Sequence, residues 1–560
     1  MMAPAADGSE HHFVSEGCIE WWQVLVAGTY YGRAFVTFLR RSSLNAGLRR
    51  SSLNAGCIGQ SGYWRYNAQA PRNDHTIDTA KRGRDRKLIF SSYSFLLIFL
   101  PITWAGFMLL RIALASSHHR APVLMLWLLV SSCWFYAQWH LPDLWVLLSV
   151  VIVNFAAAGL VAERKHYWAL PVIVTANLLL LAFFKYWPWL GGDGDRSVLL
   201  AGLPLGISFY VFQVIAFQVD LARHQTQKPA ALDFAVFLSF FPQLIAGPIV
   251  HGRKLLPQLS RLGRGPCLVG LGLTMLVLGL AKKVLLADSL AGGVDAIFAG
   301  QHALNTASVL AAAFGYGTQL YFDFSGYADM AVGLGLLFGL RLPQNFRRPY
   351  SAASLSAFWR RWHITLSSFL RDYLYIGLGG NRRGGLRRSG NLMVTMALGG
   401  LWHGAGLQFL FWGVAHGALL ATEHAVRRAL PRLAEATPLV LKTSLTLLLV
   451  MLLWLPFRAA DLDHSAALFE SLFQWSPVVL PDAVALIAPV LSMSSADSPP
   501  LIVLLWALIL LGCVSRRPTA WRWALSAQSW QRGVVTGVLL AMVLKTLADR
   551  PDQPFLYFQF

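Results

Sequence analysis

One histidine stands inside a long apolar, glycine-rich tract of the chain, where an imidazole could exchange protons. His403 lies between Trp402 and Gly404, and the apolar run 407–412 follows it. An ionisable side chain at membrane depth is costly without polar partners or a water-filled cavity, so it marks a functional site by default. The neighbouring glycine lets backbone or substrate approach closely. We therefore take His403 as the first candidate for acid–base chemistry, and a histidine bonded to another helix for packing alone is the alternative.

A second histidine, His416, lies beside Gly417 in the same tract. If the tract is one helix, the turn per residue places His416 about 220° around the axis from His403. The two rings would then face opposite sides of the helix. We expect only one of them to face a reaction.

Another histidine lies in a segment rich in tryptophan and arginine, residues 356–373. As one helix, this segment would place Trp359 and His363 on one face and Arg361 towards another. The pattern predicts a helix at the cytoplasmic surface, with tryptophans at headgroup level and His363 directed into the protein. The alternative is that His363 anchors the helix at the interface and has no chemical role.

Two carboxylates occur in the aromatic, glycine-rich tract that precedes this segment. Asp323 and Asp329 lie about 240° apart on a helix, so they cannot act as a paired acid and base. Buried carboxylates need donors or counter-ions, and Ser325 is placed to hydrogen-bond Asp329 along the helix. Further along, Gly335 and Gly339 form a GxxxG step, a pattern associated with close helix packing.

The composition is that of a membrane protein that crosses the bilayer many times. Of 560 residues, 56% are hydrophobic and 13% are charged, with 21 tryptophans. A span needs about 20 mostly apolar residues, and backbone in lipid must be helical to satisfy its polar groups. The apolar tracts predict an all-α bundle of roughly 11–13 spans. The tracts at 203–219 and 234–250 contain proline and glycine, so we expect some spans to be broken or re-entrant.

The net charge of +20 arises from 47 lysines and arginines against 27 acidic residues. In a membrane protein the excess is explained by basic cytoplasmic loops, and we expect no nucleic-acid partner. The glycine- and arginine-rich segment 377–388 has the composition to hold the phosphates of a donor, but the same loop bias accounts for it. The five cysteines are scattered, so neither a disulfide framework nor a metal site is predicted.

Residues 1–87 differ from the rest of the chain. They carry a tandem repeat, 40–47 and 49–56, and a polar run, 73–87, but no signal peptide. We expect a disordered extension or a start assigned too far upstream. A basic arm that touches anionic lipid is the alternative. The membrane domain is predicted to span 88–560.

The chain from about residue 88 onward resembles the membrane-bound O-acyltransferases, in particular the bacterial alginate O-acetyltransferase type. The resemblance is carried by a set of motifs that together are specific to that family: Phe90-Ser91-Ser92, the run 241–248, the run 321–331, 345–350, 358–367, 401–404 and 555–560.

This resemblance implies a membrane-spanning helical fold in a bacterial inner membrane and an O-acetyltransferase activity. His403 would be the essential histidine, taking a proton from a hydroxyl group that attacks a thioester. His363 would orient the donor or stabilise the developing oxyanion. No cofactor is expected to be bound; acetyl-CoA is the expected cytosolic donor, and periplasmic polysaccharide-modifying proteins are the expected partners. The residues expected to line the substrate site are Trp402, Asp323, Ser325, Trp359, Arg360 and Arg361.

Three other functions remain open at this point. A transporter or flippase could use His403, Asp323 and Asp329 as a relay, although the chain shows no inverted repeat. Related enzymes transfer a D-alanyl group to another envelope polymer. A scaffold for polysaccharide secretion would tolerate replacement of both His363 and His403. The identity of the polymer, alginate or another exopolysaccharide, does not follow from these residues.

Overall fold

The computed structural model describes one helical body. It covers residues 88–163, 166–187, 203–245, 247–382, 384–475, 500–516, 518–549, 553 and 555–556. The expectations for residues 1–87 therefore lie outside the described residues. Every regular element in the described part is a helix, as the sequence predicts.

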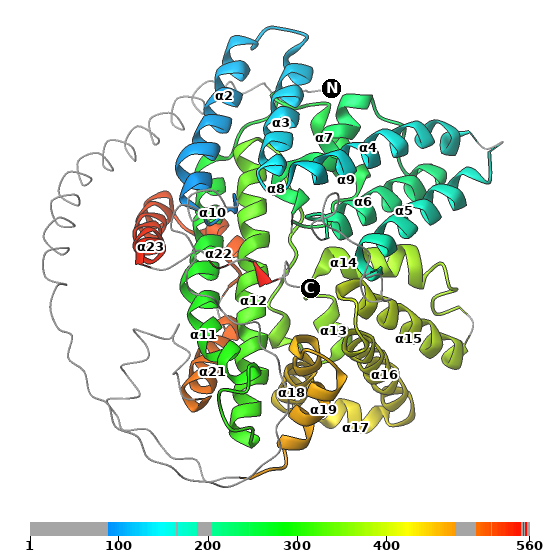
Figure 1. Ribbon diagram of the computed structural model, residues 1–560, viewed down its shortest axis with the longest axis vertical. Helices are drawn as coiled ribbons and strands as arrows, with labels where there is room; N and C mark the ends of the chain where they lie inside the picture. Colours follow the sequence, from blue (N-terminus) through cyan, green and yellow to red (C-terminus); the bar gives the residue numbers. More distant parts are fainter. Residues whose placement is uncertain are drawn as a thin grey trace, which may run out of the picture. The chain divides into compact units, whose positions relative to one another are not determined.

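The N-terminal part of this body consists of helices (Figure 1). Proline occupies the first turn of α2, α4 and α8, where its missing N–H costs no hydrogen bond. The elements are η1 (Phe95–Phe99), α2 (Leu100–Ala113), α3 (Arg120–Ala137), α4 (Leu141–Ala162), α5 (Ala169–Tyr186), α6 (Ile207–Ala222), α7 (Ala231–Ser239), α8 (Phe241–Leu244) and α9 (Gly252–Leu259).

The later elements contain the long central helix and the helices that carry the candidate histidines. They are α10 (Val269–Ala281), η2 (Lys282–Ala287), α11 (Asp288–Phe298), α12 (Thr306–Leu337), η3 (Pro349–Ser351), α13 (Leu355–Trp359), α14 (Ile364–Phe369), η4 (Leu370–Tyr375), α15 (Gly384–His403), α16 (Leu407–Ala429), α17 (Pro431–Ala436), α18 (Leu439–Arg458), α19 (Leu462–Ser471), α21 (Pro500–Arg516), α22 (Ala520–Ser526) and α23 (Ser529–Asp549).

Seven helices among the described residues are long and apolar enough to cross a membrane. They are Phe95–Ala113, Arg120–Ala137, Leu141–Ala162, Ala169–Tyr186, Val269–Phe298, Leu439–Arg458 and Ser529–Asp549. The roughly 11–13 spans expected from apolar tracts also included α12, α15 and α16, which contain more polar residues and glycine. Of these, α12 is buried over nearly its whole length and needs less hydrophobicity, because it faces protein rather than lipid.

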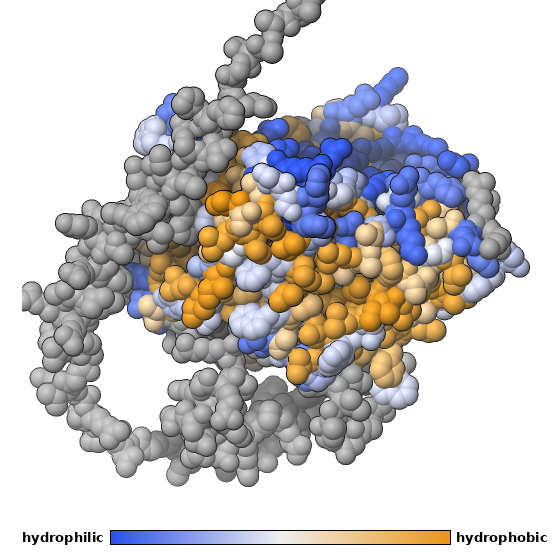
Figure 2. All heavy atoms as spheres, turned by 90° about the horizontal axis from the view of Figure 1, so that it is seen from above, coloured by the Kyte–Doolittle hydropathy of each residue, from blue (hydrophilic) through white to orange (hydrophobic). Residues whose placement is uncertain are grey.

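The surface agrees with a bilayer environment. Figure 2 shows a broad zone of hydrophobic side chains beneath a hydrophilic area on the face turned to the viewer. Large apolar side chains of the spans, such as Leu97, Leu109 and Ile152, are exposed. Exposed leucines on long apolar helices are expected where acyl chains replace water. The protein is a multi-pass membrane protein.

The centre of the body is α12, which runs along α10 in Figure 1 and is buried over nearly its whole length. Glycines let the two backbones meet. A Cβ on Gly326 would lie 2.7 Å from the carbonyl oxygen of Gly279, and one on Gly333 would lie 2.6 Å from that of Gly272. The GxxxG step predicted at Gly335 and Gly339 is wrong in position, because Gly339 instead lies beyond the helix end with a left-handed φ of 77°.

Several helices are interrupted, as the proline and glycine content predicts. Gly206 precedes α6 with a left-handed φ of 71°, and the chain bends at Phe240 between α7 and α8. The single helix expected over 356–373 is wrong. That segment is split into α13, α14 and η4, because the chain turns sharply between Trp359 and Ile364. The predicted loop 377–388 is also shorter, since α15 begins at Gly384.

Candidate active site

The candidate base lies at the end of a helix inside the protein. His403 is the last residue of α15, and α16 begins at Leu407. The chain can reverse here because Gly404 has no side chain; a Cβ there would collide with the ring of Phe409. Gly400 of α15 likewise lies against the backbone of α16 at Phe409. The glycines predicted to allow close approach therefore act between these two helices.

This reversal changes the relation between the two histidines of the tract. The rings of His403 and His416 both pack edge-on against Trp412, with centroid distances of 5.2 Å and 4.8 Å. The expectation that they face opposite sides is wrong, because it assumed one continuous helix. His416 is fully buried, and neither ring nitrogen has a hydrogen-bond partner.

His363 is held at the sharp turn before α14. Its backbone is left-handed, with φ 42° and ψ 55°. Its Nδ1 lies 3.3 Å from Oδ1 of Asn345, which also accepts hydrogen bonds from the backbone N–H and the hydroxyl of Thr365 at 3.1 Å and 3.0 Å. The Asn345 oxygen is therefore an acceptor, so Nδ1 of His363 carries the proton. Nε2, which is buried without a partner, is left as an acceptor.

Trp402 connects the two candidate histidines. Its ring lies 4.9 Å from the His403 ring and 6.2 Å from the His363 ring, measured between centroids. Both imidazoles are almost fully buried, with exposed fractions of 6% and 1%. The turn before α14 and the end of α15 thus bring together two histidines that are distant in sequence. Two imidazoles in a site shielded from water can bind and orient a hydroxyl group and accept its proton.

Trp359 belongs to the same aromatic cluster. Its ring lies 5.7 Å from Trp412 and 5.1 Å from His416. The two arginines that follow it lie differently. Arg360 is exposed, and Arg361 donates hydrogen bonds to the carbonyl and hydroxyl oxygens of Ser351 at 3.1 Å and 3.2 Å. The structure thus brings Trp359 to Trp412 and His416, and Arg361 holds the turn at Ser351.

Asp323 is fully buried and paired with a lysine. Its Oδ1 lies 2.7 Å from Nζ of Lys283, and its Oδ2 accepts a hydrogen bond from the backbone N–H of Leu556 at 2.9 Å. Asp329 is paired in the same way with Lys282, at 2.6 Å. The expectation that these carboxylates need counter-ions is met by two adjacent lysines of η2.

Ser325, also predicted to line the site, is buried, and its hydroxyl makes no hydrogen bond to Asp329. The residue between it and Asp323 is closer to the histidines. The ring of Phe324 packs edge-on against His363 at 4.7 Å. The segment around Asp323 therefore forms one wall beside His363, with the carboxylate itself engaged by Lys283.

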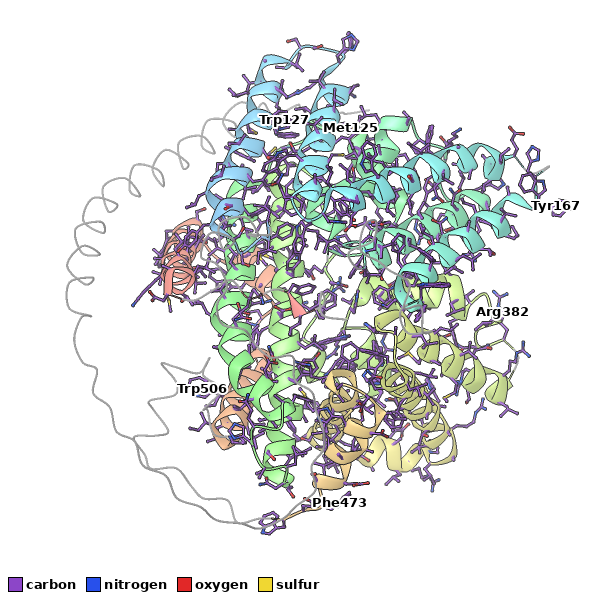
Figure 3. The ribbon with its side chains drawn as sticks, in the orientation of Figure 1. Met125, Trp127, Tyr167, Arg382, Phe473 and Trp506 are labelled. Carbon is purple, nitrogen blue, oxygen red and sulfur yellow. The ribbon has the colours of Figure 1, made fainter. Side chains whose placement is uncertain are left out.

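Three residues at the edge of the body contrast with this buried cluster. Figure 3 places Arg382 of the glycine- and arginine-rich segment, Tyr167 and Phe473 at the periphery. Tyr167 and Phe473 are 86% and 89% exposed. His363 and His403, by contrast, are buried in the interior.

Sequence reasoning missed residues that hydrogen-bond a candidate histidine or the helix end that carries one. Asn345 bonds the His363 ring, and Lys185 and Tyr186 contact the end of α15. Lys185 stands alone among apolar residues at the end of a predicted span. An ionisable group in such a place is itself a signal that could have been used.

A sequence model of the membrane-bound O-acyltransferase family matches residues 131–455, which is more than half of the chain. The chain belongs to this family. The match includes both His363 and His403 with the helices that hold them. This membrane-bound O-acyltransferase is therefore an enzyme, and the predicted fold class and family are confirmed.

Curated relatives agree with this membership. The chain is 39% identical over 414 residues to the probable alginate O-acetylase of Azotobacter vinelandii, covering 70% of this chain and 80% of the relative. It is 35% identical over 509 residues to the probable alginate O-acetylase of Pseudomonas putida, covering 84% of this chain and 100% of the relative. It is 35% identical over 425 residues to the peptidoglycan O-acetyltransferase of Helicobacter pylori, covering 69% and 80%.

Proposed function

We propose that this enzyme O-acetylates an exopolysaccharide such as alginate from the bacterial inner membrane. The acetyl donor is acetyl-CoA in the cytosol, and a periplasmic polysaccharide-modifying protein is the partner that receives or completes the transfer. Support comes from relatives named alginate O-acetylases. It also comes from the buried position of the two histidines in a membrane-spanning body.

The observation that carries this proposal is the meeting of His403 and His363 at Trp402. A sugar hydroxyl is a weak nucleophile at neutral pH and needs a base within hydrogen-bond reach. A buried imidazole at a helix end meets that need. We assign the base to His403, whose position at the break between α15 and α16 lets its ring face the interior.

The reaction follows from these roles. The acceptor oxygen attacks the acetyl carbonyl carbon while His403 takes its proton. The tetrahedral intermediate then collapses, the C–S bond breaks, and the leaving thiolate takes the proton back from the imidazolium. The products are an acetyl ester and a free thiol, with no net proton gained or lost by the enzyme.

His363 has a positioning role in this scheme. Because Nδ1 donates to Asn345, Nε2 accepts a hydrogen bond. An acceptor nitrogen can hold an O–H or N–H group of a substrate, whereas stabilising an oxyanion needs a donor. Of the two roles expected from the sequence, the hydrogen bonding of His363 therefore favours orientation of a substrate.

The same test distinguishes the proposed function from other acceptors and other activities. Peptidoglycan is a second candidate acceptor, favoured by the similarity to the Helicobacter pylori peptidoglycan O-acetyltransferase. Transfer of a D-alanyl group, a transporter and a scaffold remain the rivals. Asp323 and Asp329 each form an ion pair with a lysine. Because both carboxylates are engaged, they are poorly suited to the proton relay that a transporter would need.

The test compares His403→Ala with His424→Ala, each as the only copy in the cell. His424 lies further along α16 and bonds the carbonyl oxygen of Leu420 at 2.7 Å, so it controls for loss of a histidine from the same region. Ester-bound acetate is measured on secreted polysaccharide and on peptidoglycan, with membrane abundance of each variant.

Loss of a general base lowers a rate by about 100-fold or more, so we expect His403→Ala to abolish polymer acetate while secretion continues. His424→Ala should keep it. If His403→Ala loses acetate from peptidoglycan and not from the secreted polysaccharide, peptidoglycan is the acceptor. If acetate is unchanged on both polymers in His403→Ala, this histidine does not have the proposed role. Loss of polymer secretion with normal protein abundance would favour the transporter or scaffold.

A further inference from the structure

The end of α15 lies inside the protein, where its carbonyl groups need hydrogen-bond donors. The last four carbonyls of any α-helix have no partner within the helix. Leaving such groups unpaired in a membrane environment is costly. The helix ends at His403, so the carbonyls in question belong to the candidate base and the residues just before it.

Two adjacent residues of α5 supply donors to three of these carbonyls. Tyr186 donates its hydroxyl to the carbonyl oxygen of Leu401 at 2.6 Å. Nζ of Lys185 donates to the carbonyl oxygen of Trp402 and, at 3.0 Å, to that of His403. The last turn of one helix thus caps the C-terminus of another, across a sequence separation of more than 200 residues.

The lysine is buried, and its amine lies beside groups that attract a cation. Lys185 is 7% exposed, and Nζ lies 5.9 Å from the centroid of the Trp402 ring. The C-terminus of a helix carries a partial negative charge, and a cation there is stabilised. The aromatic face of Trp402 attracts the same cation. The amine is therefore held by the backbone of the residues that carry the site.

These contacts bear on the geometry of the reaction. After His403 the chain leaves the helix and makes a reversal through Gly404. Without fixed carbonyls, the last turn of α15 can fray, and the His403 ring moves with it. A misplacement of about 1 Å in an active site can cost about 100-fold in rate.

We propose that Lys185 and Tyr186 are positioning residues that fix the end of α15 and so place His403 for proton transfer. This inference rests on the proposed function, because it requires His403 to be the base. It adds two residues of α5, which neither the motifs nor the predicted site contain. They act through the backbone and do not touch the reacting atoms.

The experiment uses the full chain with Lys185→Met, Lys185→Arg and Tyr186→Phe. Lys228→Met is the matched control, because Lys228 is an exposed lysine that lies over Phe155, 4.9 Å from the ring centroid. Polymer-bound acetate is measured per amount of enzyme in the membrane, and the midpoint of thermal unfolding is measured on purified protein in detergent. His403→Ala is included in the same series.

We expect Lys185→Met to reduce acetate per amount of enzyme by about tenfold or more, beyond any fall in abundance or unfolding midpoint that the unpaired carbonyls cause. Tyr186→Phe loses one hydrogen bond, worth about 1 kcal/mol, and should reduce acetate about fivefold. Lys185→Arg keeps a cation and donors at the helix end and should restore much of the activity. A merely structural lysine would instead lower abundance and unfolding midpoint and leave acetate per amount of enzyme near wild type.

Wild-type acetate in Lys185→Met at normal abundance would overturn the inference, as would an arginine variant that accumulates normally and is as inactive as the methionine variant. If Lys185→Met does not accumulate, Tyr186→Phe decides: reduced acetate supports the inference and unchanged acetate refutes it. If His403→Ala retains polymer acetate, the proposed function itself is refuted. If His403→Ala is inactive and Lys185→Met is fully active, only the positioning role of Lys185 is refuted.

Discussion

At the scale of single residues, His363 occupies a backbone conformation that side chains rarely adopt. Its φ of 42° lies in the left-handed region, which costs an L-residue about 1–2 kcal/mol. Strain of this kind persists only where surrounding structure imposes it, and it occurs often at functional sites. Here the backbone N–H of Ile364 bonds the carbonyl of Asn345, so the same residue that holds the ring also holds the turn.

Replacing His363 by glycine and by alanine separates this strain from the chemistry. Both variants lose the imidazole, so both should lose polymer acetate. The glycine variant should be more stable than the alanine variant by about 1 kcal/mol, because glycine adopts positive φ without steric cost. Thermal unfolding of the two purified proteins in detergent measures the difference. An alanine variant as stable as the glycine variant would contradict the strained conformation.

At the scale of elements, the contact between α10 and α12 depends on glycines at matching positions. A Cβ on Gly333 would lie 2.6 Å both from the carbonyl oxygen of Gly272 and from the backbone nitrogen of Leu276. Both neighbours are backbone atoms, which cannot rotate away as a side chain can. The helices must separate to admit a methyl group, and α12 carries Asp323 and Phe324 beside His363.

We therefore expect Gly333→Ala to destabilise the protein by about 1–3 kcal/mol, the usual cost of overpacking. Gly537→Ala on α23 is the control, because a Cβ there meets nothing within 4 Å. That change should be neutral or stabilising by up to about 1 kcal/mol, since alanine favours helix. Membrane abundance and unfolding midpoint are the measurements. Equal stability of the two variants would show that the helices can separate without cost.

At the scale of the whole molecule, residues 88–90 pack against the helices of the membrane body. The carbonyl oxygen of Leu88 accepts a hydrogen bond from the Trp139 indole at 2.9 Å. Phe90 is fully buried and stacks on Tyr327 of α12 at a centroid distance of 4.7 Å. These contacts make residues 88–90 part of the packed core, which the sequence predicts to begin at residue 88.

Two truncations test this boundary. A chain that starts with methionine followed by Leu88 should accumulate and acetylate polymer like the full chain. A chain that starts at Tyr93 loses Phe90, and removing a buried phenylalanine side chain costs about 3–5 kcal/mol, so it should accumulate poorly. Polymer acetate and membrane abundance are compared for both. Loss of activity in the chain that starts at Leu88 would assign a role to residues 1–87.

Much of the architecture follows from local sequence properties. Long apolar tracts must be helical in lipid because no water is present to satisfy their backbone groups, and all regular elements of the described part are indeed helices. His403 and His363 could be chosen as candidates because ionisable residues are rare in apolar tracts. The sequence motifs around these two histidines indicated the family. None of this requires knowledge of contacts between distant segments.

The tertiary structure decided which groups meet. The side that His416 faces depends on the break after His403, which periodicity along one helix cannot reveal. The partner of Asp323 is Lys283, and the donors to the end of α15 come from α5. Such pairs lie far apart in sequence, and only packing of the helices brings them within hydrogen-bond distance. Local patterns define each helix, whereas the geometry of the site arises where several helices end or break together.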